Sequence, residues 1–366
     1  MEQKKVYKVA ARDTLESIAE KTGYTPEEIR QWNNNHSYHN IRKMFESYLL
    51  PLEIVLPDYP PKPKPKPKEL TPEEKEKKLL EDLAQEKETK YRCEQSVISK
   101  INGIIQNYAN TKSEFLVRKQ QPEGRLIVKI EITDSITEVY PDNLAAAMQL
   151  LNDVEMIKCD VGILADAQTG KIARILNHRS IINRWEKHKV ALQGKYGFVR
   201  SSQTREDLNK FISLAENQIT NEQNLIQDLN IKVFFGLFFE RYLVADNSMQ
   251  DVSYATTFNS QLFENVRVPM QFTQKIISES EEKVSLNKTG VLDKKKYSSS
   301  AFERMYDAKF KPIVKYKFAD FNMQYNENCT INTREKCIET AEITIIEEVK
   351  NNVEINISCN IKKIKN

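Results

Sequence analysis

The residues of this 366-residue chain that could do chemistry are few and far apart. His36-x-x-His39 resembles half of a zinc site, but no Cys or carboxylate at ligand spacing completes the usual four ligands nearby. His178 and His188 lie on a predicted helix without a nucleophile elbow or a Cys-His signature. The pattern predicts partly exposed histidines, no bound metal and no cofactor.

Carboxylate pairs are the second possible source of chemistry, since two of them can share acid–base work. Asp160 and Asp166 flank a predicted hairpin, and Glu131 and Asp134 end a predicted strand. Such residues are common at strand edges, and the chain has no Walker loop, Rossmann fingerprint or metal-hydrolase motif. We therefore predict a non-enzymatic protein. A wall-acting or toxin enzyme within residues 90–366 is the alternative that only geometry could support.

Composition narrows the class of protein further. The chain has 55 basic and 52 acidic residues, a net charge of +3, so it has no overall field that would attract nucleic acid. Only 9 glycines are present, which argues against glycine-rich phosphate loops. With 40% hydrophobic and 29% charged residues, the chain is typical of a globular protein with two or three domains.

The opening residues lack the apolar stretch of 7–15 residues that marks a secretory signal. The longest apolar run, residues 233–239, is far shorter than the roughly 20 residues that span a bilayer. We expect a protein that is cytoplasmic as synthesised, without a membrane span. Export would then require a secretion or injection machine into which the protein is assembled.

Five cysteines occur without a C-x-x-C pair, and we predict buried, reduced thiols. Cys329 and Cys337 could face each other across a hairpin, but spacing alone does not establish a disulfide, and their redox state stays open. The others are Cys93, Cys159 and Cys359.

Residues 1–57 have the pattern of a compact βααβ unit. A short strand over residues 6–9 is followed by Asp13-Thr14, which offers an N-cap for a helix that Gly23 ends. Thr25-Pro26-Glu27-Glu28 begins a second helix with a capping box, and Asn33 to Asn35 end it. A closing strand runs from Leu52 to Leu56.

This segment resembles a LysM domain. Tyr7-x-Val9, then Arg12-Asp13-Thr14-Leu15 and Ile18-Ala19, match the opening of the family in order. Trp32-Asn33 matches the end of its second helix, and Ile54-Val55-Leu56-Pro57 matches its closing strand. The resemblance covers about 57 of the 366 residues, and no family is recognised beyond it.

The resemblance implies a shallow groove that in this family often binds N-acetylglucosamine polymers such as peptidoglycan or chitin. Between the first strand–helix loop and the second helix–strand loop, a glycan- or partner-binding groove would be formed by Arg12, Asp13, Thr14, Asn33, Asn34 and Ile41. Backbone amides and a small apolar wall suit the N-acetyl group in such a groove.

Three departures from the family pattern bear on function. Arg12 replaces the usual glycine, residues 34–49 form a longer loop with an extra helical turn predicted over 41–45, and Leu50-Pro51-Leu52 replaces Pro-Gly-Gln. LysM-like modules also connect protein components in phage tails and contractile injection machines. We therefore favour an adaptor whose module docks on such an apparatus while the C-terminal domain binds another protein. Peptidoglycan binding at the cell wall is the alternative.

Residues 58–70 are rich in alternating proline and lysine and predict a polyproline II linker. Its reach would be on the order of 35 Å at about 3.1 Å per residue. A docking peptide for an aromatic groove is the other interpretation. Residues 71–89 predict an exposed, charged helix that begins with Thr71-Pro72.

Residues 90–366 predict a larger β-rich α+β domain of antiparallel strands, with helices at about 142–152, 178–193 and 203–229. Hairpins are predicted over 154–176 and 339–364, and a division into two subdomains near 200–245 is left open. Core packing is the default interpretation of the apolar run, and a partner-binding patch is the functional alternative. This patch would be formed by Phe234, Phe235, Phe238 and Phe239.

Overall fold

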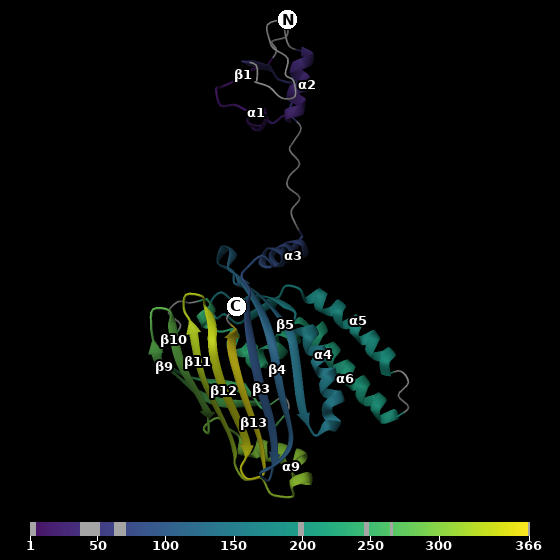
Figure 1. Ribbon diagram of the computed structural model, residues 1–366, viewed down its shortest axis with the longest axis vertical. Coiled ribbons are helices and arrows are strands. Elements are labelled where there is room, and N and C mark those ends of the chain that lie inside the picture. The colour runs from purple at the N-terminus through teal and green to yellow at the C-terminus, as the bar shows by residue number, and fades with distance from the viewer. Residues whose placement is uncertain are drawn as a thin grey trace. The chain divides into compact units, whose positions relative to one another are not determined.

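The computed structural model describes residues 5–36, 52–61, 71–196, 201–244, 249–263 and 266–364. The chain divides into two compact units, Met1–Thr71 (unit 1) and Pro72–Asn366 (unit 2), and each has its own hydrophobic core (Figure 1). No described helix is long and apolar enough to cross a membrane.

Unit 1 has the predicted βααβ order. Its strands pair antiparallel, and its elements are β1 (Val6–Lys8), α1 (Leu15–Thr22), α2 (Pro26–His36) and β2 (Glu53–Val55). Thr14 and Ser17 form a capping box at the start of α1. Gly23 ends the helix at φ 82°, a conformation that glycine adopts without steric cost.

The core of unit 1 is small. It contains the apolar positions of the two helices and of β2, which are Leu15, Ile18, Ala19, Tyr24, Ile29, Ile54 and Leu56. Both helices show the apolar spacing of amphipathic helices. Strand β2 contacts both α2 and β1, and α2 also contacts α1. The extra helical turn predicted over 41–45 lies outside the described residues.

The first residues of the predicted linker over 58–70 pack against unit 1. Tyr59 packs edge-on against Trp32, with ring centroids 5.3 Å apart, and its carbonyl accepts a 2.6 Å hydrogen bond from the Tyr24 hydroxyl. Residues 58–61 therefore belong to unit 1, because an aromatic contact outweighs the local preference for extended chain. Residues 62–70 lie outside the described part of the chain.

The predicted exposed helix over 71–89 is shorter and only partly exposed. Helix α3 (Pro72–Leu83) buries Leu83 completely against Ile127 and Leu176. Gly162 lies beneath Leu80 at a distance that would leave no room for a Cβ atom. The prediction of an exposed helix is wrong for this face, because leucines at helical spacing dock onto unit 2.

Unit 2 is built on one antiparallel sheet in the order β7-β6-β5-β4-β3-β13-β12-β11-β10-β9-β8. Strand β13 pairs with β3 along its whole length, so the N-terminal and C-terminal strands of unit 2 lie side by side at the centre of the sheet (Figure 1). A division into subdomains near 200–245 is therefore wrong. The strands are β3 (Thr89–Ile101), β4 (Ile104–Gln120), β5 (Ile127–Tyr140), β6 (Val161–Ala165), β7 (Ile172–Ile175), β8 (Val252–Asn259), β9 (Arg267–Glu279), β10 (Lys283–Leu292), β11 (Phe321–Asn332), β12 (Cys337–Val349) and β13 (Val353–Ile364).

The helices of unit 2 follow the predicted regions with shifted ends. Residues 154–158 continue α4 instead of starting a strand, and Asn221 caps a new helix within the predicted helix over 203–229. The helices are α4 (Ala145–Lys158), α5 (His178–Tyr196), α6 (Ser202–Thr220), α7 (Glu222–Ile231), α8 (Val233–Phe238), α9 (Ser299–Lys309) and α10 (Lys311–Val314). Short 3₁₀ turns cover Pro122–Gly124, Asp142–Leu144 and Arg241–Leu243.

The sheet buries one face and leaves the other polar. Along β12, Ala341, Ile343 and Ile345 are buried, while the residues between them are less buried and include glutamate and threonine. This period of two is the signature of a sheet with a single apolar face. The helices α4 to α8 pack on that face, while α3 packs on the opposite face of β5 and β6.

The five cysteines are buried and unpaired in the described part of the chain. Cys329 lies opposite Ala341 and Cys337 opposite Asn332, so these two do not face each other across the β11–β12 hairpin. The possibility that the hairpin brings them together is not met, because the register places them at different levels of the ladder. Cys93 and Cys359 are closer, with their sulfurs 3.5 Å apart.

Candidate functional site

The loop between β1 and α1 is held in shape by Asp13. Its carboxylate accepts hydrogen bonds from the Lys21 ammonium at 2.5 Å, from the backbone amide of Ala10 at 2.9 Å and from the Tyr7 hydroxyl at 3.0 Å. The hydrogen bond from Lys21, followed by that from Ala10, lowers the pKa of Asp13 to about 2. The Asp13 carboxylate therefore stabilises the conformation of this loop.

Of the two residues that flank Asp13, one caps α1 and the other is exposed in the turn. The Thr14 hydroxyl accepts a 3.1 Å hydrogen bond from the backbone amide of Ser17, as an N-cap does. Arg12 is exposed in the turn before it. Of the three residues predicted at this side of the groove, Arg12 is the one whose side chain extends from the surface of unit 1.

The other predicted side of the groove is at the end of α2. Asn33 is completely buried, and its side-chain oxygen accepts a 3.0 Å hydrogen bond from the amide of Val55. Its placement in a ligand groove is wrong, because this amide side chain joins α2 to β2. Asn34 is half-buried, and Ile41 lies outside the described residues.

His36 takes part in an aromatic cluster. Its ring stacks on Trp32 with centroids 3.8 Å apart, and its Nδ1 lies 3.0 Å from the Trp32 carbonyl oxygen. The zinc interpretation of His36 and His39 gains nothing from this arrangement, and His39 lies outside the described residues.

The four phenylalanines of α8 and its C-cap are in the core of unit 2. Phe234 stacks on Phe115 with ring centroids 4.0 Å apart, and Phe235 and Phe239 are completely buried. The four side chains lie in the core, which was the default interpretation, and the alternative of a partner-binding patch at Phe234, Phe235, Phe238 and Phe239 is wrong. The sheet itself covers the aromatic surface that one helical face could not bury.

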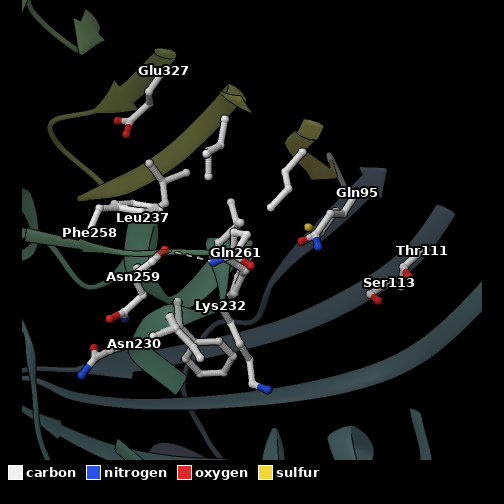
Figure 2. A pocket seen from close by; sticks show the side chains of 18 of the residues that line it. Gln95, Thr111, Ser113, Asn230, Lys232, Leu237, Phe258, Asn259, Gln261 and Glu327 are labelled. Carbon is white, nitrogen blue, oxygen red and sulfur yellow. Dashed lines mark hydrogen bonds between the residues drawn. The ribbon is translucent and has the colours of Figure 1, made fainter. Parts of the chain in front are cut away.

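Unit 2 contains a cavity of about 590 Å³ between the buried face of the sheet and helices α4, α7 and α8. Its apolar lining includes Phe115, Ile132, Phe234, Phe235, Leu237, Phe272, Ile345 and Ile357. Figure 2 shows Glu327 and Phe258 at one side of this cavity and Gln95, Thr111 and Ser113 at another. The volume lies within the range of small-molecule sites, which is about 300–1,000 Å³.

The charged residues of the cavity wall are paired with one another. Lys288 lies 3.3 Å from Glu327, and both side chains are nearly buried. Burial alone lowers the pKa of Lys288, but the negative charge of Glu327 outweighs it, and the net pKa is raised. The Lys171 ammonium contacts Glu240 at 2.6 Å.

A third charged group lies beside α4, where Glu155 and Lys232 line the cavity. Lys232 contacts Glu155 and Asp228, and Lys158 contacts the same two carboxylates at 2.6 and 2.8 Å. Two ammonium groups thus face two carboxylates, and the local charge is balanced.

A buried carboxylate fixes the segment that follows β8. Glu347 is completely buried on β12 and accepts hydrogen bonds from the Ser260 hydroxyl and from the backbone amides of Gln261 and Leu262. Burial raises the pKa of Glu347 in spite of these donors. Gln261, which this contact positions, lines the cavity (Figure 2).

Asp160, Asp166 and His178 have structural partners, whereas the Nε2 atom of His188 is buried without a hydrogen-bond partner among the described residues. Asp160 pairs with Lys129 and with Arg184, the latter at 2.9 Å, and Asp166 accepts hydrogen bonds within its own turn. The Nε2 atom of His178 lies 2.7 Å from the Ile219 carbonyl oxygen. These groups connect elements of unit 2 and do not converge on a shared cleft.

One group of acidic residues and a thiol has the spacing of metal ligands, namely Glu335, Cys337 and Glu339. The Lys363 ammonium occupies its centre, bonding to Glu335 and lying 3.3 Å from the Cys337 sulfur and 3.2 Å from Glu339. The Lys363 ammonium thus already supplies the positive charge that a metal ion would bring to this group.

Unit 1 is a small βααβ module whose first loop is fixed by an aspartate. The LysM domain model matches residues 7–42, which confirms the predicted resemblance of this segment to a LysM domain. No curated protein matches the chain.

Among solved structures, a chain titled "Lipid-protein interactions in lipovitellin" is similar at 12% sequence identity with a TM-score of 0.35. The alignment covers 76% of this chain and 25% of that one, so this chain spans about a quarter of the length of the lipovitellin chain. Likeness at this level supports no inference about fold or ligand.

Proposed function

We propose that this protein is a non-enzymatic, modular binding protein whose LysM domain attaches it to an N-acetylglucosamine polymer such as peptidoglycan. The observation that carries the proposal is the LysM match over residues 7–42, together with the fixed loop between β1 and α1. The match supports polymer binding better than docking on a phage-tail-like or injection apparatus. That docking, and a protein partner for unit 2, stay predictions from the sequence.

Recognition would use the surface of the loop more than its acidic side chain. The side-chain oxygens of Asp13 and Thr14 accept hydrogen bonds within the loop and at the N-terminus of α1. Arg12 is exposed, so its side chain is accessible to a ligand. A guanidinium at this position suits the carboxylates of peptidoglycan stem peptides, since it binds carboxylates in a bidentate manner. Arg12 would then favour peptidoglycan over neutral chitin.

The test is sedimentation with insoluble peptidoglycan and with chitin. We expect the full chain to pellet with peptidoglycan and a chain that begins at Pro72 to stay in the supernatant. Equal pelleting of both chains would remove the role of unit 1. No pelleting of the full chain with either polymer would contradict the proposal.

A pair of charge reversals tests the role of Arg12. Arg12→Glu should weaken retention on peptidoglycan about tenfold, which corresponds to about 1.4 kcal/mol of binding free energy. Retention on chitin should change much less. Arg30→Glu is the matched control, because Arg30 lies on α2 and pairs with the exposed Glu27 at 3.5 Å. Equal losses in both variants would indicate a nonspecific effect of charge.

A further inference from the structure

The cavity of unit 2 is a second binding site. We propose that it takes one aliphatic chain of a lipid, with the polar head of the lipid left at the cavity mouth. The site lies in unit 2 and is independent of glycan binding by unit 1.

The volume leaves room for an occupant. About 590 Å³ corresponds to the volume of roughly 20 water molecules in the liquid. Close-packed protein interiors leave few voids larger than one water. Waters would each need two to four polar partners, and a floor of Phe115, Ile132, Ile345 and Ile357 offers none. An apolar guest satisfies this floor, which is one part of a lining that also contains polar side chains such as Gln95, Thr111 and Gln261.

The shape favours a long, thin guest. Lining residues come from every strand between β5 and β8 in the order of the sheet, from Ile132 on β5 to Tyr254 on β8. Eight strand spacings of about 4.8 Å give a path of about 38 Å along the curved sheet. A guest that follows this path is elongated, as an unbranched hydrocarbon chain is.

The charges of the wall favour a guest that is uncharged along its buried length. The lining contains Lys171, Lys232 and Lys288, and each of these ammonium groups contacts a carboxylate. A buried anion would have to break one of these pairs, which is costly in a low-dielectric interior. A methylene chain passes them without that cost.

The mouth is open and bordered by apolar side chains. Leu151 on α4 and Ile231 at the end of α7 line the cavity and are exposed, Leu151 by 44% and Ile231 by 55%, and the half-buried Met148 lines the cavity beside them. Asn152 and Asn230 lie at the same edge and can bond a polar head group. Figure 2 shows Asn230 and Lys232 at this border of the cavity.

The test uses the full chain after removal of copurified lipid. The probe is a polyene fatty acid whose fluorescence rises in an apolar site, displaced by palmitate or by lysophosphatidylcholine with the same acyl chain. Displacement by both supports the site for an aliphatic chain of either source. Displacement by one alone supports it and identifies the head group. Absence of probe binding would overturn the proposal.

A series of fatty acids of increasing length provides a readout that needs no variant. Each added methylene should strengthen binding by about fourfold until the cavity is full, after which the gain should stop. Affinity that does not change with chain length would contradict burial of the chain.

A filling variant tests the location. Thr111 lies on β4 facing the cavity, and its hydroxyl contacts that of Thr137 at 3.1 Å. Thr111→Trp should project an indole into the cavity and weaken probe binding at least tenfold. Lys112→Trp is the matched control, because Lys112 is the next residue of the same strand and is exposed on the opposite face. Unchanged binding in a folded Thr111→Trp protein would place the probe elsewhere.

Discussion

Unit 1 and unit 2 both bury polar side chains, but they do so for different purposes. In unit 1, Asn33 and Asp13 satisfy backbone amides and hold a small core together. In unit 2, Lys288 and Glu327 satisfy each other at the wall of a large cavity. A buried polar group therefore indicates a binding site only when open volume lies beside it.

The two units also differ in what their apolar residues surround. The core of unit 1 is a compact cluster of apolar side chains, whereas in unit 2 aromatic and other apolar side chains line one side of a cavity. Unit 1 consequently presents its candidate site on a surface loop, and unit 2 presents its candidate site inside. The following predictions test this contrast. They can be measured separately because the chain has two tryptophans, Trp32 in unit 1 and Trp185 in unit 2.

The largest effect is expected from Phe235→Ala. Phe235 is completely buried in α8, and loss of its ring should lower the free energy of unfolding of unit 2 by about 3–5 kcal/mol. Denaturant unfolding followed through Trp185 measures this loss. Ile277→Ala, at a residue that is 65% exposed, is the control and should change little. A loss under about 1 kcal/mol for Phe235→Ala would contradict its place in the core.

A medium effect confined to unit 1 is expected from Asn33→Ala. The substitution leaves the Val55 amide buried without its acceptor, which should lower the free energy of unfolding of unit 1 by about 1–3 kcal/mol. Unfolding followed through Trp32, in a chain carrying Trp185→Phe, reports on this unit. Asn35→Ala, on the exposed side of the same helix, should be close to neutral. If both substitutions had equal effects, Asn33 would not connect α2 to β2.

A smaller effect is expected from Thr14→Ala. Removal of the hydroxyl that caps α1 should lower the free energy of unfolding of unit 1 by about 1 kcal/mol. Thr14→Ser keeps the acceptor oxygen and should restore most of the loss. Failure of serine to restore it would show that the methyl group, not the cap, matters.

The smallest effect is a dependence of unit 1 on acid. The pKa of Asp13 is about 2 in the folded chain, below its ordinary value of 3.8, so the unfolded chain takes up a proton first as the pH falls. The stabilisation by Asp13 is therefore complete above about pH 4 and is lost between pH 3.8 and pH 2. Thermal unfolding of unit 1 across this range should show the loss, and Asp13→Asn should flatten it. An equally steep dependence in Asp13→Asn would assign it to other carboxylates.

Local signals in the sequence were sufficient for the framework of unit 1. Thr25 and Glu28 form the predicted capping box, and Gly23 ends α1 as predicted, because these motifs depend only on neighbouring residues. The role of Asn33 was missed because its partner, Val55, is far along the chain. Nothing in the local pattern distinguishes a ligand amide from a structural one.

The cavity of unit 2 could not be predicted, because its lining comes from strands distributed over most of the unit. One signal was nevertheless present. Along β11, the buried alternation of Phe321, Met323 and Cys329 is interrupted by Glu327, and Glu347 interrupts β12 in the same way. A carboxylate at an inward position requires either a partner or a polar space, and both glutamates lie beside or near the cavity wall.

The central claim is that the chain has two binding regions that work independently. The most direct measurement assays both activities, retention on peptidoglycan and uptake of the polyene fatty acid, in the full chain and in its Arg12→Glu and Thr111→Trp variants. We expect Arg12→Glu to lose retention and keep uptake, and Thr111→Trp to lose uptake and keep retention. Loss of both activities in either folded variant, or of neither activity in both variants, would contradict the account.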